Sequence, residues 1–169
     1  MAVSPKLKTL DELLTLRREW AEQGKIVVWT NGCFDLLHAG HVHSLRGAKS
    51  LGDILVVGIN SDESIRANKG PLRPVMSEAD RAEVLGALES VDHVTVFNEA
   101  DPVAAIAALR PDIHCKGADY ADGAKPIPEQ EIVLGYGGQI RFLPVYEGRS
   151  TSGLIARIVA AYSGASCQP

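Results

Sequence analysis

Two histidines and two glycines lie close together within residues 30–42. His38 and His41 are three residues apart, so one turn of helix would place both rings on the same side. Two imidazoles directed at one anion can donate hydrogen bonds and, when charged, neutralise it. Gly32 allows a tight turn, and Gly40 stands where a helix with free N–H groups would begin. The stretch therefore favours a site that binds phosphate.

A predicted strand and a predicted helix flank this stretch. Residues 26–29 are apolar and mostly β-branched or aromatic, which predicts a buried strand. Apolar residues then recur at helical spacing from Val42 to Leu51, and Gly52 stands where that helix would stop. In open α/β sheets, ligands bind at such junctions, at the carboxyl ends of the strands.

Two other interpretations of the histidines compete with phosphate binding. A core histidine satisfied by backbone groups is the common alternative for a single histidine, but it rarely explains two histidines beside two glycines. A zinc site would need a third ligand at suitable spacing and usually the order His-Glu-x-x-His, which the sequence lacks. We therefore adopt phosphate binding and assign no metal-ligating residues.

The composition is that of a soluble globular protein. The 169 residues suffice for one domain with a core, and 46% of them are hydrophobic. A net charge of −4 argues against a nucleic-acid partner. No apolar run reaches about 18 residues and no signal peptide is recognisable, so we expect no membrane partner and a cytoplasmic location. The 3 cysteines lack the number or spacing of a disulfide framework or metal site.

The motif in residues 32–42 carries a family resemblance. It reads Gly-Cys-Phe-Asp-Leu-Leu-His-Ala-Gly-His-Val and resembles the His-x-Gly-His signature of the cytidylyltransferase-like nucleotidyltransferases. Residues 25–158 most resemble the adenylyltransferase domain of bacterial ADP-heptose synthases. The resemblance implies that His38 and His41 act on the triphosphate and that Asp35 orients a histidine or a magnesium ion. It also implies nucleotide contacts from Asn31, Gly32, Cys33, Phe34 and Gly40.

A second apolar run, residues 53–60, predicts a strand parallel to the first, because one short helix between two buried strands forms a βαβ unit. Asn60 and Asp62 stand at its carboxyl end, where ligands gather in such sheets. They are candidates for binding substrate. Alternatively, this polar segment caps a helix that begins near Asp62.

Residues 65–74 are basic, contain Gly and Pro and follow no regular period, which predicts a loop. Cations on a loop are usually only solvated, yet Lys69 and Arg73 could offset the charge of a nucleoside triphosphate. The resembled family has Lys-Gly-x-x-Arg-Pro at this place. The resemblance implies that Lys69 stabilises the triphosphate and that Arg73 binds substrate.

Residues 77–80 predict a capping box and a helix that continues to about Glu89. Arg81 falls in the first turn, where a cation opposes the helix dipole. A residue placed against local preference is a mild indication of function. The resemblance implies that Arg81 contacts substrate phosphate, and a surface salt bridge is the alternative.

Residues 113–116 predict a further strand that ends in a glycine turn. Its Lys-Gly-x-Asp-Tyr sequence resembles that of the heptose adenylyltransferases, which implies that Lys116, Gly117, Asp119 and Tyr120 line the nucleotide pocket. Tyr120 could stack on a base and Asp119 could bond to it. A tight turn explains Gly117 equally well.

Three hydroxyl residues, Ser150, Thr151 and Ser152, precede an apolar helix. One of them is needed as a cap, and three exceed that need. The helix start could therefore form a second anion site that faces the first. The segment resembles the Ser-Thr-Thr motif of the superfamily, with Ser152 in the last place, which implies that all three bind the nucleotide.

These elements, with strands predicted over 91–97 and 139–143, indicate an α/β fold. We expect a single Rossmann-like, doubly wound domain with about five parallel strands. Residues 1–24 are predicted as an N-terminal helical extension, residues 25–162 as the nucleotidyltransferase domain, and residues 163–169 as a disordered tail.

The resemblance implies transfer of AMP from ATP to D-glycero-β-D-manno-heptose 1-phosphate, which yields ADP-heptose and pyrophosphate for lipopolysaccharide or another surface glycan. Mg²⁺ is expected with the nucleotide, since phosphate-bound Mg²⁺ needs few protein ligands. Many relatives carry a fused sugar kinase, for which 169 residues leave no room, so a separate kinase is expected to supply the sugar phosphate. Relatives are often dimers, so a homodimer is expected.

Two alternatives to this function remain. Cytidylyl transfer to glycerol 3-phosphate, or to another polyol or sugar phosphate, would use the same motifs. A nucleotide-binding regulatory protein without catalysis is the non-enzymatic alternative. The complete set of histidines, cations and hydroxyls argues against it, because a silent relative has no reason to keep all of them.

Overall fold

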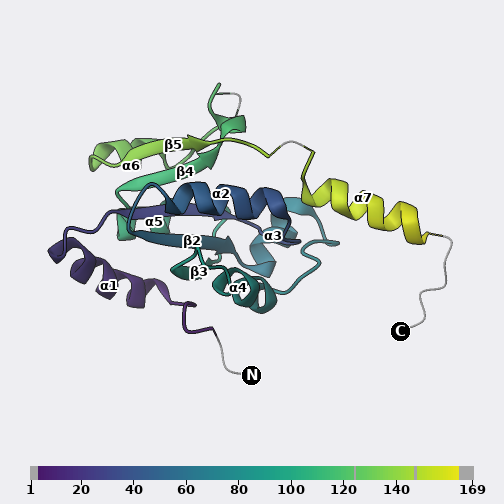
Figure 1. Cartoon of the computed structure of the whole chain (residues 1–169), viewed down its shortest axis with the longest axis horizontal. Helices are drawn as coiled ribbons and strands as arrows, with labels where there is room; N and C mark the ends of the chain where they lie inside the picture. Colours follow the sequence, from purple (N-terminus) through teal and green to yellow (C-terminus); the bar gives the residue numbers. More distant parts are fainter. Residues whose placement is uncertain (1–3, 124, 147, 164–169) are drawn as a thin grey trace.

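A parallel β-sheet of 5 strands runs through the middle of the chain, with helices on both of its faces (Figure 1). The computed structural model describes residues 4–123, 125–146 and 148–163. The strands lie in the order β3-β2-β1-β4-β5, and every neighbouring pair is parallel. They are β1 (Val27–Gly32), β2 (Ile54–Asn60), β3 (His93–Phe97), β4 (Ile113–Gly117) and β5 (Gln139–Leu143).

Hydroxyl side chains mark the starts of four helices. Thr9 forms a capping box with Glu12, while Ser61, Ser77 and Ser150 each accept the N–H of the residue three positions later. The helices are α1 (Leu10–Glu22), α2 (Ala39–Lys49), α3 (Asp62–Lys69), α4 (Glu78–Gly86), α5 (Val103–Leu109), α6 (Gln130–Gly135) and α7 (Thr151–Tyr162), with a 3-10 turn η1 (Ala118–Tyr120).

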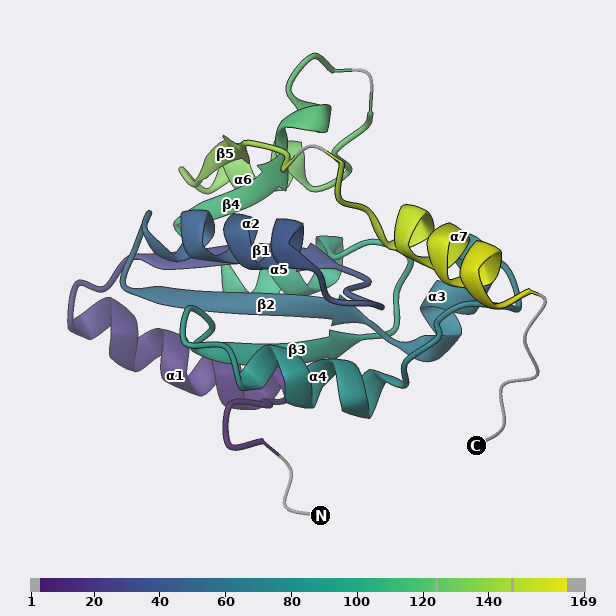
Figure 2. The same ribbon diagram turned by 45° about the vertical axis from the view of Figure 1, so that its right-hand side comes forward.

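Side chains of β1 alternate between two cores. Val28 packs with Leu45 of α2 and Leu85 of α4 on one face of the sheet. Val27 and Trp29 pack on the other face with side chains from α1, α5 and α6. Figure 2 shows α2 in front of the sheet and α5 behind it. Because helices cover both faces, the strands are continuous apolar runs, as parallel strands generally are.

The strand order places a switch point between β1 and β4. Along β2, the pairing of β1 continues to Gly32. Along β4, it ends where Thr30 pairs with Cys115. Beyond these residues β1 and β4 are no longer paired, and in doubly wound sheets the crevice at such a point binds ligands.

The structure confirms the predicted fold class, a single Rossmann-like domain with parallel strands. Two boundaries were wrong. Residues 65–69, predicted as a loop, complete α3, because Ser61 caps this helix and Ile65 is buried in the core, while Gly70 ends it. Two helical turns are too short for the apolar period to show in the sequence. In addition, α4 ends at Gly86 rather than near Glu89.

The predicted N-terminal extension packs on the sheet, since Leu13 and Trp20 of α1 are buried in one of the two cores. The predicted tail lies outside the described residues, apart from Ser163. No helix in the described part of the chain is long and apolar enough to cross a membrane.

Gly58 in β2 lies against Trp29 with no room for a side chain. A Cβ at position 58 would lie 2.3 Å from Cζ2 of Trp29. Gly58→Ala should therefore lower the free energy of unfolding by about 1–3 kcal/mol, because overpacking forces neighbours out of their preferred rotamers. Urea unfolding followed by tryptophan fluorescence measures the loss. Gly135→Ala is the control, since nothing lies within 4 Å of a Cβ there, and an equal loss in both variants would contradict this packing.

Candidate active site

The two predicted phosphate-binding histidines lie ring against ring at the start of α2. His38 is the N-cap residue, and its ring stacks on that of His41 with 3.8 Å between centroids and 19° between planes. The Nδ1 atom of each ring is buried and has no hydrogen-bond partner among the described residues. Neither Nδ1 is therefore committed to holding the protein together.

Aromatic rings leave little room for a side chain at two glycines of this turn. A Cβ on Gly40 would lie 3.0 Å from the His38 ring, and a Cβ on Gly32 would lie 3.2 Å from the ring of Phe34. Phe34 itself has a left-handed backbone, with φ at 47°. Its ring lies 5.2 Å from that of His41, centroid to centroid. The turn is thus a close-packed unit that fixes both histidines.

The environment keeps both rings uncharged near neutral pH. Burial and the neighbouring His38 lower the pKa of His41 to about 4. Burial and the Arg149 guanidinium hold the pKa of His38 below its ordinary value. A bound phosphate would raise both pKa values, because a nearby anion favours the charged imidazolium.

Asp35 is bonded to the loop before α4. Its Oδ1 accepts the N–H groups of Val75 and Met76 at 2.8 and 2.9 Å, and its Oδ2 accepts from Nε of Arg73 at 2.6 Å. Burial raises the pKa of Asp35, but these bonds outweigh it and hold that pKa below its ordinary value. The role predicted for Asp35, orienting a histidine or a magnesium ion, stays a prediction; its contacts favour a structural role, because both oxygens accept hydrogen bonds within the protein and 1% of the residue is exposed. Arg73, predicted to bind substrate, is the partner of this carboxylate.

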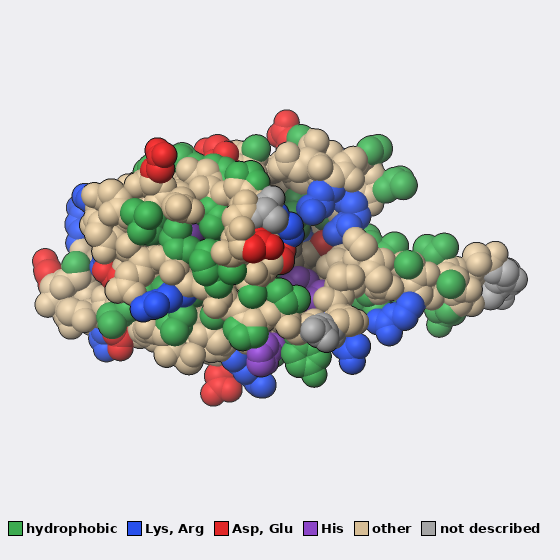
Figure 3. Space-filling model, turned by 90° about the horizontal axis from the view of Figure 1, so that it is seen from above, with side chains coloured by type: hydrophobic (Ala, Val, Ile, Leu, Met, Phe, Trp, Pro, Cys, Tyr) green, Lys and Arg blue, Asp and Glu red, His purple; other side chains and the backbone are tan. Residues whose placement is uncertain are grey.

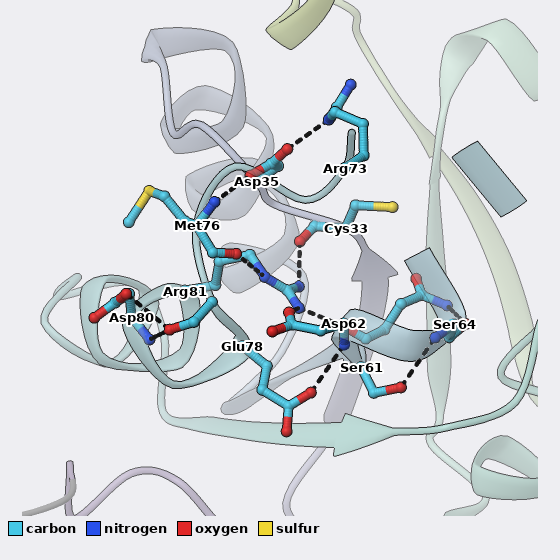
Figure 4. Close-up of polar contacts among 12 residues, drawn as sticks. Cys33, Asp35, Ser61, Asp62, Ser64, Arg73, Met76, Glu78, Asp80 and Arg81 are labelled. Atoms are coloured by element: carbon cyan, nitrogen blue, oxygen red, sulfur yellow. Dashed lines mark hydrogen bonds and ion pairs between the residues drawn. The ribbon is translucent and has the colours of Figure 1, made fainter. Parts of the chain in front are cut away.

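The Arg81 guanidinium connects the turn after β1, the end of β2 and the loop before α4 (Figure 4). It donates to three backbone carbonyls, those of Cys33, Asn60 and Met76, at 2.6, 2.8 and 3.2 Å. It also donates to Oδ1 of Asp62 at 2.8 Å. The side chain has no exposed surface, which rules out the surface salt bridge. The predicted phosphate contact stays a prediction, and a structural role is favoured because the guanidinium makes four hydrogen bonds within the protein.

Asn60 and Asp62 are bonded within the protein, and Ser61 between them caps α3. Nδ2 of Asn60 donates to Oγ of Ser64 at 3.1 Å. Asp62 pairs with Arg81, as described above. The contacts thus support a structural role, although Asn60 also borders the crevice described next.

A cavity of about 380 Å³ lies at the carboxyl ends of β1, β2 and β4. Asn31 near the end of β1 and Cys33 just after it form part of the wall, and Lys69 borders the cavity at the end of α3. Lys116 near the end of β4 and Tyr120 of η1 border it as well. The cavity therefore brings together predicted residues from three separate segments, two of them lysines. A larger hollow of about 1010 Å³ lies at the amino ends of β1, β4 and β5, and none of the predicted site residues lines it.

The segment after β4 is only partly directed at this crevice. Gly117 and Tyr120 border it, whereas Asp119 is exposed and forms an ion pair with Lys125. Two ammonium groups lie near the Tyr120 ring, that of Lys116 at 5.3 Å and that of Lys125 at 5.0 Å from its centroid. Tyr120 thus has cations close to its ring at the rim of the crevice.

The three hydroxyl residues before α7 have different roles. Ser150 caps the helix by accepting the N–H of Gly153 at 3.0 Å. Thr151 donates its hydroxyl to the carbonyl of Leu36 at 3.5 Å, which ties the helix start to the histidine turn. Ser152 is exposed. One hydroxyl therefore remains without a structural task.

The start of α7 and the histidine turn are in close contact. A Cβ on Gly40 would lie 3.3 Å from Cβ of Arg149, the residue before the cap. Figure 3 shows a hollow between the body of the molecule and the projecting α7, with histidine at its base and charged side chains around it. Two helix starts thus meet at one place, as the sequence predicted.

Two buried residues at the site were not predicted from the sequence. Oε1 of Glu129 lies 2.7 Å from Nε2 of His114 and 2.5 Å from Nζ of Lys116. A histidine inside an apolar strand was a signal, but Glu129 is 15 residues away and nothing local marks it as the partner. In the described part of the chain, no group of three or more His, Cys, Asp or Glu side chains could hold a metal ion.

Paired histidines and a cationic crevice at the switch point of a Rossmann-like sheet define a nucleotide-binding α/β domain. The cytidylyltransferase-like family model matches residues 29–154, and the chain belongs to this family.

Named relatives agree with this assignment. The chain is 47% identical over 164 residues to the bifunctional protein HldE of Methylobacillus flagellatus, covering 94% of this chain and 32% of that protein. It is 47% identical over 158 residues to HldE of Geobacter sulfurreducens, covering 93% and 32%. The chain thus spans about a third of the length of these relatives. The crystal structure of the lipopolysaccharide core biosynthesis protein from Thermoplasma volcanium matches with a TM-score of 0.58 and 31% identity, covering 73% of this chain and 98% of that chain.

Arg81→Lys should lower the free energy of unfolding by about 3 kcal/mol, because an ammonium cannot reproduce the fork of a buried guanidinium. Urea unfolding measures the loss. Arg66→Lys on α3 makes the same exchange at an exposed position and should change stability by less than about 0.5 kcal/mol. Similar free energies of unfolding for the two variants would show that the Arg81 hydrogen bonds do not stabilise the fold.

The His41 ring should titrate near pH 4 in the free protein. Because the unfolded chain protonates this ring near its ordinary pKa of 6.5, His41 makes the fold less stable as the pH falls from 6.5 towards 4. Inorganic pyrophosphate should raise the midpoint by about one unit or more. NMR of the histidine Cε1–H signals, assigned with His41→Asn, measures both values. A free-protein midpoint above pH 6, or one that pyrophosphate leaves in place, would contradict this description.

Proposed function

We propose that this chain transfers AMP from ATP to D-glycero-β-D-manno-heptose 1-phosphate, releasing pyrophosphate and forming ADP-heptose. The observation that carries the proposal is the stacked pair of uncommitted histidines, against which the start of α7 packs. The crevice with two lysines next to it suits a phosphorylated acceptor. Relatives named HldE and a lipopolysaccharide core biosynthesis protein support the choice of sugar.

The reaction is a displacement at the α-phosphorus of ATP. An oxygen of the sugar phosphate attacks, the bond to the bridging oxygen breaks, and pyrophosphate leaves without a covalent enzyme intermediate. His38 and His41 would hold the triphosphate, whose charge favours protonated rings that donate hydrogen bonds. Lys69 supplies positive charge from the side of the crevice. Catalysis then rests on positioning and on stabilising the phosphoryl oxygens.

Magnesium is expected to arrive with the triphosphate. The described residues contain no cluster that could cage a metal ion, and the Asp35 carboxylate is occupied by three donors. The protein side chains therefore do not fit a resident metal site. Phosphate oxygens and water are the ligands that would hold Mg²⁺.

The proposal implies two partners. A sugar 1-phosphate forms when a phosphoryl group is transferred to the anomeric hydroxyl, so we propose a sugar kinase as its supplier. We also propose a homodimer, as the family resemblance implies.

Pyrophosphate release should require ATP, heptose 1-phosphate and Mg²⁺ together. His41→Ala should lower kcat by about 10²–10³-fold, since it removes a donor to charge that develops in the transition state. A coupled pyrophosphate assay, crossing ATP, CTP and GTP against heptose 1-phosphate and glycerol 3-phosphate, measures this. His43→Ala is the matched control, because His43 is an exposed histidine of the same helix.

Release with CTP and glycerol 3-phosphate alone would keep the chemistry and replace the substrates. Absence of release from every pair, with His41→Ala binding nucleotide as tightly as the wild type, would support the regulatory alternative and refute the enzyme. Equal activity of His41→Ala and His43→Ala would remove the histidine pair from the mechanism.

A further inference from the structure

A buried carboxylate stands behind one of the two lysines of the crevice. Glu129, just before α6, has no exposed surface, and its Oε1 accepts from Nζ of Lys116. His114 and Lys116 are two residues apart on β4, so they project from the same face of the strand. The Lys116 side chain is 11% exposed and borders the crevice. Glu129 also lines the crevice, but its carboxylate has no exposed surface, whereas the Lys116 ammonium is partly exposed there.

This carboxylate is ionised in spite of its burial. Burial alone would raise the pKa of Glu129, but the hydrogen bonds of His114 and Lys116 bring it to about 2. Burial lowers the pKa of His114 against the opposing effect of Glu129, which leaves that ring neutral, with Nε2–H as donor. Lys116 is therefore the one charged group in the described structure that contacts and compensates Glu129.

A buried ion pair adds little to the free energy of unfolding, because apolar residues of similar volume usually stabilise a fold as well or better. Oε2 of Glu129 also lacks a hydrogen-bond partner among the described residues, which makes the arrangement costlier still. What the pair does achieve is to fix a long, flexible side chain. A free lysine would lose side-chain entropy on binding a ligand, and a lysine already held loses less.

The position of Lys116 indicates which ligand it meets. The crevice that Lys116 shares with Lys69 is bordered by neither His38 nor His41, nor by the start of α7. The two lysines therefore face a space next to the histidine turn. On the proposed function, the histidine turn holds the triphosphate and the crevice holds the phosphorylated acceptor.

We propose that Glu129 is a positioning residue that aims the Lys116 ammonium at the phosphate of the acceptor. This inference rests on the proposed function and assigns Lys116 to the acceptor instead of the nucleotide. One N–H of Lys116 is directed at Glu129, which leaves two for the acceptor phosphate. Glu129 acts only through Lys116, and this makes the two residues energetically inseparable in acceptor binding.

A double-mutant cycle tests this dependence. Glu129→Gln keeps the shape but removes the charge, and it should raise KM for heptose 1-phosphate about tenfold while KM for ATP stays within about twofold. Lys116→Met should raise the acceptor KM at least as much. In the Lys116→Met background, Glu129→Gln should have no further effect on the acceptor KM, yet it should raise the melting temperature by removing an uncompensated buried charge. Glu19→Gln on α1, an exposed position, is the control for loss of one carboxylate.

Additive effects of the two substitutions on the acceptor KM, or an equal rise in KM for ATP, would overturn the inference. So would a Glu129→Gln variant that loses only kcat. Titration calorimetry with heptose 1-phosphate in the absence of ATP separates this inference from the reaction itself. A wild type that binds the sugar phosphate tightly, and Glu129→Gln about tenfold more weakly, supports the positioning role even if no pyrophosphate is released, in which case only the proposed reaction fails. Failure of the wild type to bind either heptose 1-phosphate or inorganic phosphate would overturn the inference outright.

Discussion

The loops that carry the site depend on one buried guanidinium. Carbonyl groups just beyond the ends of parallel strands lose their partners in the sheet, and leaving them unpaired in a buried place is costly. Arg81 satisfies one such carbonyl after β1 and the carbonyl of the last residue of β2, while it also bonds to the loop before its own helix. Asp35 adds a second connection between the first and third of these segments. The histidine turn therefore cannot shift without disturbing the ends of two strands and the start of α4.

The fold was readable from the sequence because its causes are local. Strands buried on both faces are continuous apolar runs, which the sequence shows directly. Thr9, Ser77 and Ser150 indicate the starts of three helices, because hydroxyl residues are typical N-caps. The histidine pair was readable for the same reason, since a spacing of three and two adjacent glycines depend on neighbours in the chain. A helix start near Asp62 was one of two readings of its segment, but the continuation of α3 to Lys69 was not predicted, because its apolar face consists of little more than Ile65.

Roles that depend on distant partners could not be read in this way. The sequence shows the charges of Arg81 and Asp35 and so suggests ligand binding, but it does not show the carbonyls and N–H groups that surround them in the fold. Glu129 was overlooked, because its partners lie on a strand whose register with α6 the sequence does not express. The roles of buried polar residues are thus hard to predict from sequence, since the same side chain stabilises the fold in one place and binds a ligand in another.

The attachment of α7 links the anion site to the integrity of this helix. None of its described residues is buried, and Ile158, Val159 and Tyr162 are exposed along it, so α7 is held mainly through its first turn. An anion that contacts both the histidines and this first turn stabilises the attached arrangement by the free energy of the second contact. Thermodynamic reciprocity then requires that whatever strengthens the attachment of α7 also tightens anion binding by the same factor. Anion binding at the histidine turn and attachment of α7 are thus coupled, so a measurement of either one reports on the other.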